Sequence, residues 1–351
     1  MVDKQKREEM QAKQKRVRLI DVAERAKVSR WAVSSVLLGT GKDRVRVSDE
    51  KAAFIKRLAD EMGFFPDNSA QMLKGKKSKI IGVLIDSYPP QAYFEVLASA
   101  EAVLCKNGYR IMVGQTHDNY KNLKLYISDF VSRRVDGIIC FAHGYPDFDT
   151  VKDLKNFDHV VFVGEPRNPD VNHVATDIKL GVRKIVKHLL ETGCKRIGHF
   201  LLNSGSTAHI HRLEGYREEL ENNNFVYDEK MIFQCSTKKL NEKDYMDAIN
   251  YLVLQQGVDA IIANNDMWGV MLIKYLQKSG IKVPEDVAVV GFDNLDIVNV
   301  SSPELTSIDI KSGEQGKAAA RMILEMIEGK SSDGGKQIKV DPEIVVRRST
   351  Q

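Results

Sequence analysis

The chain is poor in the residues that would mark a disulfide-stabilised, metal-binding or membrane-spanning protein. It has four cysteines in 351 residues, and none form the C-x-x-C spacing of a zinc or redox site. No apolar run reaches the roughly 18 residues of a transmembrane helix, and residues 1–17 lack the apolar core of a signal peptide. We therefore expect a cytoplasmic protein without metal or cofactor, and buried thiols at Cys105, Cys140, Cys194 and Cys235.

Recognisable catalytic motifs are also missing. The chain has no phosphate-binding glycine loop, no G-x-S-x-G and no H-E-x-x-H. His209 and His211 lie in a stretch that we expect to be a loop, where such histidines are more often solvated than metal ligands. Asp266 and Asp293 could form an acid–base pair or accept hydrogen bonds from ligand hydroxyls. We favour binding over catalysis and expect a protein that is not an enzyme.

Residues 18–38 carry the strongest functional signal. Apolar and small residues recur there at helical spacing in two short runs with a break between them. Ser29 stands at the N-cap position of the second run. Any two short amphipathic helices would show this pattern, but it is also typical of a helix-turn-helix that places its second helix in the DNA major groove. The outward face of that helix would carry Arg30, Trp31, Ser34 and Ser35.

The distribution of charge favours the DNA-binding interpretation. Residues 1–79 hold 20 lysines and arginines against 11 acidic residues, whereas the rest of the chain holds 32 against 37. A basic small domain joined to an acidic larger one is typical of a protein that binds a polyanion. We expect a flexible basic tail over 1–17, a helix-turn-helix domain over 18–63, and a hinge helix with linker over 64–78.

From residue 79 onward, apolar runs of strand length alternate with helix-patterned stretches. This alternation predicts parallel sheets covered by helices on both faces. It continues for too long to form one small sheet, so we expect two similar α/β subdomains around a cleft within residues 79–351. Residues 338–350 are expected to form one last strand. Ligands in such folds bind beyond the carboxyl ends of the strands, which here fall near Asp86, Phe141, His143, Gly164, Glu165, Asn264, Asn265, Asp266, Phe292 and Asp293.

Three blocks of sequence, in order, resemble the lactose-repressor/purine-repressor (LacI/GalR) family. The first is IDVAERAKVSRWAVSSVLL with the later GFFPDNSAQMLKGKKSKIIGVL. The second comprises VDGIICFAH, HLLETGCKRIGHF and RLEGYREEL. The third runs from DAIIANNDMWGVMLIKYLQKSGIKVPEDVAVVGFDN to SPELTSIDIKSGEQGKAAARMILEMIEG. Together they cover residues 18–348. The resemblance implies an all-α helix-turn-helix domain followed by an effector domain of two subdomains like that of periplasmic sugar-binding proteins.

The resemblance also implies roles for residues of the DNA-binding part. By position, Arg30, Trp31 and Ser35 match residues that read bases, Leu73 matches the hinge leucine that enters the minor groove, and Lys74 follows it. Alternatives remain for three of them. Arg30 could contact phosphate, Trp31 could pack under the long loop over 39–48, and Leu73 could belong to a core.

In the cleft, the family resemblance implies effector contacts by Tyr93, Phe94, Arg212, Asn265 and Asp293. Arg212 offers a planar fork of donors, and Asp293 offers a bidentate acceptor. Phe94 could instead be helix core. Outside this implied set, Trp268 could stack on a sugar or pack in a helix, and His143 could contact a ligand or be solvated.

The sequence departs from the family pattern at Trp31, Ser35 and Gln71, at the long loop over 39–48, and at Gly164-Glu165. We therefore expect an unusual operator and an unusual effector. The combined interpretation is a homodimeric, sequence-specific transcriptional regulator, most simply a repressor, that binds double-stranded operator DNA. A small polar effector such as a sugar would control this binding. The alternative is a sugar-binding protein without a DNA role, and a cytoplasmic enzyme on this α/β scaffold is the third interpretation.

Overall fold

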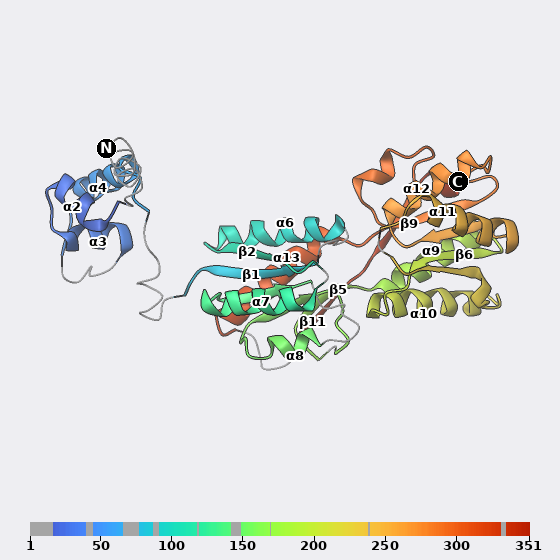
Figure 1. Cartoon of the computed structure of the whole chain (residues 1–351), viewed down its shortest axis with the longest axis horizontal. Coiled ribbons are helices and arrows are strands. Elements are labelled where there is room, and N and C mark those ends of the chain that lie inside the picture. The colour runs from blue at the N-terminus through green and yellow to red at the C-terminus, as the bar shows by residue number, and fades with distance from the viewer. Residues whose placement is uncertain are drawn as a thin grey trace, which may run out of the picture. The chain divides into compact units, whose positions relative to one another are not determined.

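The structure is a computed structural model that describes residues 17–39, 45–65, 77–86, 91–117, 119–141, 149–168, 170–237, 239–330 and 335–351. The chain divides into two compact units, Met1–Lys76 and Lys77–Gln351. Figure 1 shows a small helical unit and a larger unit built from two lobes. Within these described ranges, every helix is too short or too polar to cross a membrane.

The first unit contains the predicted helix-turn-helix. Its helices are α2 (Leu19–Ala26), α3 (Arg30–Leu38) and α4 (Asp49–Glu61). Helix α2 ends at Lys27, which has a positive φ of 54°, and the Oγ of Ser29 accepts a hydrogen bond of 3.2 Å from the backbone N–H of Ala32 at the start of α3. The three helices pack around one small core of Val22, Ala23, Ala26, Val33, Ile55, Ala59 and Phe64. The break between the two apolar runs of the sequence is therefore a tight turn.

The first lobe of the second unit is a parallel sheet with helices on both faces. In the described residues its strand order is β11-β5-β4-β3-β1-β2. The strands are β1 (Ile80–Ile85), β2 (Arg110–Gln115), β3 (Gly137–Cys140), β4 (Val160–Val163), β5 (His173–Thr176) and β11 (Gln337–Val340). The helices are α6 (Gln91–Lys106), α7 (Tyr120–Ser132), α8 (Thr150–Leu154) and α13 (Ser312–Ile327).

Alternate residues of each strand face opposite layers of this lobe. Ile81 and Val83 pack in a core with α6 and α13, whereas Leu84 packs in a second core with α7 and α8. This explains why the strand is an unbroken apolar run in the sequence. Helix α13 comes from the C-terminal part of the chain and lies beside α6 in Figure 1.

The second lobe repeats the arrangement with strand order β12-β10-β9-β8-β6-β7 in the described residues. Its strands are β6 (Ile197–Leu202), β7 (Ile232–Cys235), β8 (Ala260–Ala263), β9 (Ala288–Asp293), β10 (Thr306–Asp309) and β12 (Glu343–Val345). Its main helices are α9 (Ile178–Glu191), α10 (Thr207–Asn222), α11 (Glu242–Ile249) and α12 (Asp266–Lys278). Shorter helical turns are η1 (Glu229–Met231), η2 (Asn250–Gln255), η3 (Asp296–Asn299) and η4 (Arg348–Thr350). All pairings in this sheet are parallel except that of β12 with β10.

The chain crosses between the two lobes three times, after β5, after β10 and after β11. The crossing segments are bonded to one another. The hydroxyl of Thr176 donates to the carbonyl of Ile310 at 2.8 Å, and the N–H of Asp177 donates to the carbonyl of Val340 at 3.0 Å. The lobes are thus joined by three adjacent segments, an arrangement suited to hinge motion.

Two expectations from the sequence were wrong. Residues 338–350 do not form one strand, because β11 belongs to the first sheet and β12 to the second, with Pro342 in the crossing between them. The four cysteines are not all buried. Cys105 is exposed near the end of α6 and Cys194 is partly exposed, while Cys140 and Cys235 are buried.

Candidate functional site

A cleft of about 890 Å³ lies in the second unit where the carboxyl ends of strands from both sheets converge. The first lobe contributes residues that end or follow β1, β3, β4 and β5, among them Asp86, Phe141, Glu165 and Thr176. The second lobe contributes residues that end or follow β6, β8 and β9, among them Asn203, Asn264, Asn265 and Asp293. The predicted position of a ligand site in such sheets coincides with this cleft.

Arg212 projects from α10 into the cleft and is 9% exposed. Its guanidinium lies over the ring of Phe292, 4.0 Å from the ring centre. Among the described residues, its Nη1 has no hydrogen-bond acceptor. A buried charged donor without an acceptor costs free energy. An acceptor on a bound ligand would remove that cost.

Asp293 ends β9 and faces the same cleft. Burial raises the pKa of its carboxyl well above the usual range, the negative charge of Asp266 raises it further, and Arg212 opposes both. The backbone of Asp293 has a φ of 115°, which is rare for a residue with a side chain. Strained backbone of this kind is concentrated at functional sites.

An aromatic pair from the first lobe lines one side of the cleft. Tyr93 on α6 lies 5.0 Å from Phe141, measured between ring centres, and both line the cleft. Phe94 is 52% exposed and is not among the described residues that line it. Successive side chains of a helix point about 100° apart, and here Tyr93 faces the cleft whereas Phe94 is exposed.

Asn265 and Trp268 lie at the start of α12. The Oδ1 of Asn265 caps this helix by accepting a hydrogen bond of 2.9 Å from the N–H of Trp268. Trp268 is 4% exposed and packs on Phe200 with 4.8 Å between ring centres, and it also lines the cleft. Its ring therefore belongs to the core of the second lobe and presents only a small part of its surface to a ligand.

Several cleft residues were not predicted from the sequence. They include Gln91, Asn203, Ser204, Ser206, Thr207, His209, His211, Arg167 and Gln315. Most follow β6, where the largely polar run NSGSTAH directly follows an apolar strand. That run was the available signal, since it marks the carboxyl end of a parallel strand.

The expected loop around His209 and His211 was wrong. Both lie in the first turns of α10, which Ser206 caps by accepting a hydrogen bond from the N–H of His209. The Nδ1 of His211 is 3.6 Å from a carboxylate oxygen of Glu165, so this pair joins the two lobes across the cleft. Arg167 adds a second such contact, because its Nη2 donates to the carbonyl of Gly205 at 3.3 Å. In the described part of the chain, no three metal-binding side chains cluster together.

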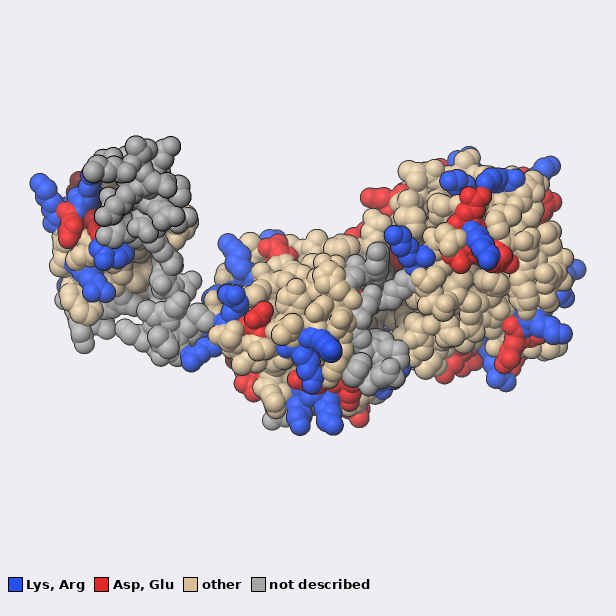
Figure 2. All heavy atoms as spheres, viewed as in Figure 1, with Lys and Arg blue, Asp and Glu red and all other residues tan. Residues whose placement is uncertain are grey.

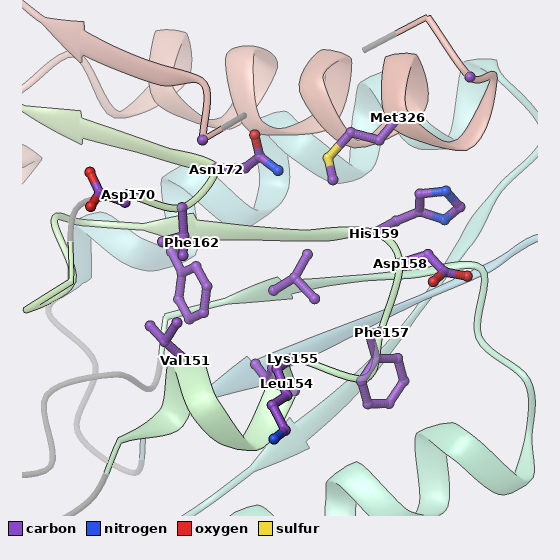
Figure 3. Close-up of a pocket in the computed structure, with 14 residues that line it drawn as sticks. Val151, Leu154, Lys155, Phe157, Asp158, His159, Phe162, Asp170, Asn172 and Met326 are labelled. Atoms are coloured by element: carbon purple, nitrogen blue, oxygen red, sulfur yellow. The ribbon is translucent and has the colours of Figure 1, made fainter. Parts of the chain in front are cut away.

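A second hollow, of about 580 Å³, lies in the first lobe between α8, β4 and the end of α13 (Figure 3). Leu154, Phe157, Phe162 and Met326 form its apolar part, and His159 and Asp158 lie at one side. The predicted site residues that the structure describes do not line it.

The predicted DNA-binding residues lie mainly on α3. Ser29, Arg30 and Trp31 are exposed, with Trp31 at 56%, and Ser34 is partly exposed. Ser35 was expected on the outward face, and this was wrong, because it is only 8% exposed. It lies three residues after the buried Ala32, on the same face of the helix. Leu73, Lys74 and His143 lie outside the described residues.

Charged side chains of both signs are intermingled over the visible face of both lobes (Figure 2). Residues 80–351 hold 32 lysines and arginines against 37 acidic residues, so they lack the basic excess that the sequence places in residues 1–79. The basic excess of the chain thus belongs to the unit that holds the helix-turn-helix.

Comparison with known proteins agrees with this architecture. Residues 186–350 match the model of the periplasmic binding protein-like domain. The chain is 25% identical to the HTH-type transcriptional repressor PurR of Photobacterium profundum, over 94% of this chain and 98% of that protein. It is 25% identical to the HTH-type transcriptional repressor CytR of Escherichia coli, over 94% and 95%, and 28% identical to PurR of Vibrio campbellii, over 94% and 98%.

Solved structures share the fold. A lac repressor dimer bound to operator and the anti-inducer ONPF superposes with a TM-score of 0.81 at 23% identity, covering 96% of this chain and 99% of that one. The complex of the transcriptional regulator CelR with cellobiose gives a TM-score of 0.68 at 24% identity, covering 95% and 100%. The chain thus combines a helix-turn-helix unit with a two-lobed cleft, and it is similar along almost its whole length to transcriptional repressors of the LacI/GalR family.

Proposed function

We propose that this protein is a homodimeric transcriptional repressor that binds a specific operator through α3. Binding of a small polar effector in the cleft changes its affinity for that operator. The observation that carries the proposal is that one chain has both an exposed helix-turn-helix face and a polar cleft, where a buried Arg212 donor has no acceptor among the described residues. A sugar-binding protein would need only the cleft, and the helix-turn-helix unit would then have no role.

The DNA-binding half of the proposal rests on the geometry of α3. Ser29 caps the helix, and the next two residues, Arg30 and Trp31, are exposed at its N-terminal end. The N-terminal residues of a recognition helix are those that contact base edges. Arg30 offers a bidentate donor for guanine, and Trp31 offers an apolar surface for a thymine methyl group. One such helix reads a half-site, so specific binding requires a dimer and a near-palindromic operator.

The effector half rests on the chemistry of the cleft. Its lining combines neutral hydrogen-bonding side chains and the charged Asp86, Glu165 and Arg167 with three further features. These are the buried guanidinium of Arg212, the partly buried carboxyl group of Asp293, and the aromatic pair Tyr93 and Phe141. Hydroxyl groups of a sugar can donate to Asp293 while they accept from Arg212. The solved CelR complex contains a sugar, cellobiose, which agrees with this class of ligand. We therefore propose a sugar as the effector.

Effector control follows from the two-lobed construction. Arg212 and Asp293 belong to the second lobe, whereas Tyr93 and Phe141 belong to the first. A ligand that contacts both lobes favours one closure angle over another. It can shift the equilibrium only by the difference between its affinities for the two states.

The first test is operator selection by the purified full chain from a random DNA pool, followed by binding measurements with Arg30→Ala and Trp31→Ala. We expect a near-palindromic site and weaker, less specific binding by both variants, by about 1–3 kcal/mol for a lost base contact. Arg321→Ala, on the exposed face of α13, is the matched control and should bind like wild type. A pool that yields no enriched site would refute the DNA role.

The second test concerns the cleft. A thermal-shift screen of sugars should identify an effector, since a ligand at 100 times its dissociation constant adds about 2.7 kcal/mol of stability. Asp293→Ala should then bind operator normally but bind the effector about 5- to 150-fold more weakly, because ligand donors are left unpaired at a cost of about 1–3 kcal/mol. Phe94→Ala, outside the described lining, is the matched control. Calorimetry that gives wild-type affinity for Asp293→Ala would place the site elsewhere.

A further inference from the structure

One buried carboxylate lies directly behind the cleft and does not line it. Asp266 is the first residue of α12 and is 0% exposed. A fully buried carboxylate is disfavoured unless hydrogen bonds and nearby charge compensate the lost water. Its partners therefore indicate what it stabilises.

Those partners surround Asp293. One oxygen of Asp266 accepts a hydrogen bond of 2.5 Å from the hydroxyl of Ser307, and the other accepts one of 2.7 Å from the N–H of Leu295. The Ser307 oxygen in turn accepts a hydrogen bond of 3.1 Å from the N–H of Asn294. The two peptide N–H groups that follow Asp293 are thus both hydrogen-bonded. That of Leu295 donates directly to Asp266, and that of Asn294 donates to Ser307, which donates to Asp266.

The backbone held in this way is one that residues with side chains rarely adopt. The φ angles of Asp293 and Asn294 are 115° and 55°. Arg347 adds a third restraint, because its Nη2 donates to the Oδ1 of Asn294 at 2.9 Å and its Nη1 donates to the carbonyl of Leu305 at 3.0 Å. Without such restraints, Asp293 would relax to a negative φ, and its carboxyl group would change direction relative to the cleft.

The absence of a side chain at Gly291 on β9 leaves space for the carboxylate of Asp266. Gly291 on β9 is paired in register with Ser307 on β10. A Cβ atom at position 291 would overlap the Oδ1 of Asp266. The glycine, the buried serine and the buried carboxylate therefore fit together as one unit.

We propose that Asp266, acting through Ser307, is a positioning residue that holds the carboxyl group of Asp293 in the effector cleft. The proposal rests on the proposed function in one respect, that Asp293 contacts the effector. It assigns Asp266 no contact with the effector and no acid–base chemistry.

The charge of Asp266 gives the arrangement a measurable signature. The groups that act on Asp293 are Asp266 and Glu95, whose negative charges raise its pKa, and Arg212, which lowers it. Burial raises the pKa of Asp266 to about 7. Above that pH, Asp266→Asn removes one negative charge and keeps the shape of the side chain, so Asp293 should lose its proton at a lower pH.

The experiment needs no effector. The full chain is labelled at the aspartate carboxyl carbons with ¹³C, and the resonance of Asp293 is identified by its loss in Asp293→Asn. Its titration is recorded in wild type, Asp266→Asn, Ser307→Ala and Ser307→Thr, and crystal structures give the φ of residue 293. Asp259→Asn is the matched control, because Asp259 also accepts two backbone bonds, from Lys195 and Arg196, but at the opposite end of the sheet.

We expect a lower titration midpoint in Asp266→Asn, a negative φ at residue 293 in Ser307→Ala, and recovery of the wild-type φ in Ser307→Thr. Asp259→Asn should match wild type in both measurements. An unchanged midpoint in Asp266→Asn together with an unchanged φ in Ser307→Ala would overturn the proposal. Operator binding is also measured for each variant, because a variant that still binds operator has not misfolded. Because no effector is used, failure of the effector assignment would leave both readouts interpretable.

Discussion

At the scale of single residues, the cleft concentrates groups that are costly to bury. Arg212 holds a donor without an acceptor among the described residues, and Asp293 combines a raised pKa with a rare backbone conformation. Such groups lower stability and persist because they serve function. The cleft residues should therefore show opposite effects of substitution on stability and on effector binding.

The pH dependence of stability tests this for Asp293. Its folded-state pKa is raised by burial, so the folded protein holds this proton more tightly than the unfolded chain. The stabilisation is complete below the ordinary carboxyl pKa of about 3.9 and is lost as pH rises through the higher folded-state value. Asp293→Asn cannot lose this proton. Its Tm should fall less than that of wild type as the pH rises above the ordinary carboxyl pKa of about 3.9, as measured by calorimetry. Parallel Tm curves would contradict a raised pKa.

At the scale of elements, helix ends and helix contacts decide where functional side chains lie. Helix α3 begins at its Ser29 cap, and α10 and α12 begin at the edge of the cleft. The positions of Arg30 and Arg212 therefore depend on the helix caps Ser29 and Ser206, and Asn265 both caps α12 and lines the cleft.

Ser29→Ala should weaken the start of α3. Loss of an N-cap costs about 1 kcal/mol, so we expect a lower Tm of the first unit and weaker operator binding. Ser29→Asp should retain the cap and the stability, yet it should bind operator more weakly because it adds a negative charge beside DNA phosphates. Ser48→Ala removes the cap of α4 and provides the control within the same unit. It should lower stability while affecting operator affinity less than Ser29→Ala.

Helix α13 packs closely on α6 at one glycine. A Cβ atom at Gly316 would overlap the backbone oxygen of Val96, whereas one at Gly313 would make an ordinary contact with Ser99. Gly316→Ala should cost about 1–3 kcal/mol through overpacking. Gly313→Ala, in the same helix, should be neutral or stabilising because alanine favours helix by up to about 1 kcal/mol. Urea unfolding of the two variants gives the comparison, and equal midpoints would show that the helices can separate without cost.

At the scale of the whole molecule, the chain divides into two units of different net charge. The basic excess lies in residues 1–79 and the acidic excess in the remainder. The first unit should bind the DNA backbone, and the second unit should add little to that electrostatic attraction.

Operator binding should therefore depend steeply on salt. Each phosphate neutralised contributes a slope of about −0.9 to log K against log salt. Arg30→Ala should reduce the slope by about one if Arg30 contacts phosphate and leave it unchanged if Arg30 reads a base. Fluorescence anisotropy over a salt series, at protein concentrations where ultracentrifugation shows a dimer, makes this measurement. A flat salt profile would argue against the electrostatic role of the first unit.

The sequence by itself determined the elements and the edge at which the site lies. Helical spacing located α2, α3 and α4, and unbroken apolar runs located β1, β8 and β9, because local periodicity reflects which side of an element is buried. The carboxyl ends of those strands indicated Asp86, Asn265 and Asp293 as cleft residues, since parallel strands end at one edge.

Only the tertiary structure decided which neighbours those residues meet. Ser35 is buried within its own unit, and residues 338–350 are divided between two sheets. Tyr93 lines the cleft, whereas Phe94 lies outside the described lining. The tertiary structure also brings Ser307 onto Asp266, 41 residues away in the chain. Pairing and burial between distant segments depend on how whole layers pack, and the periodicity of one segment carries no information about its partner.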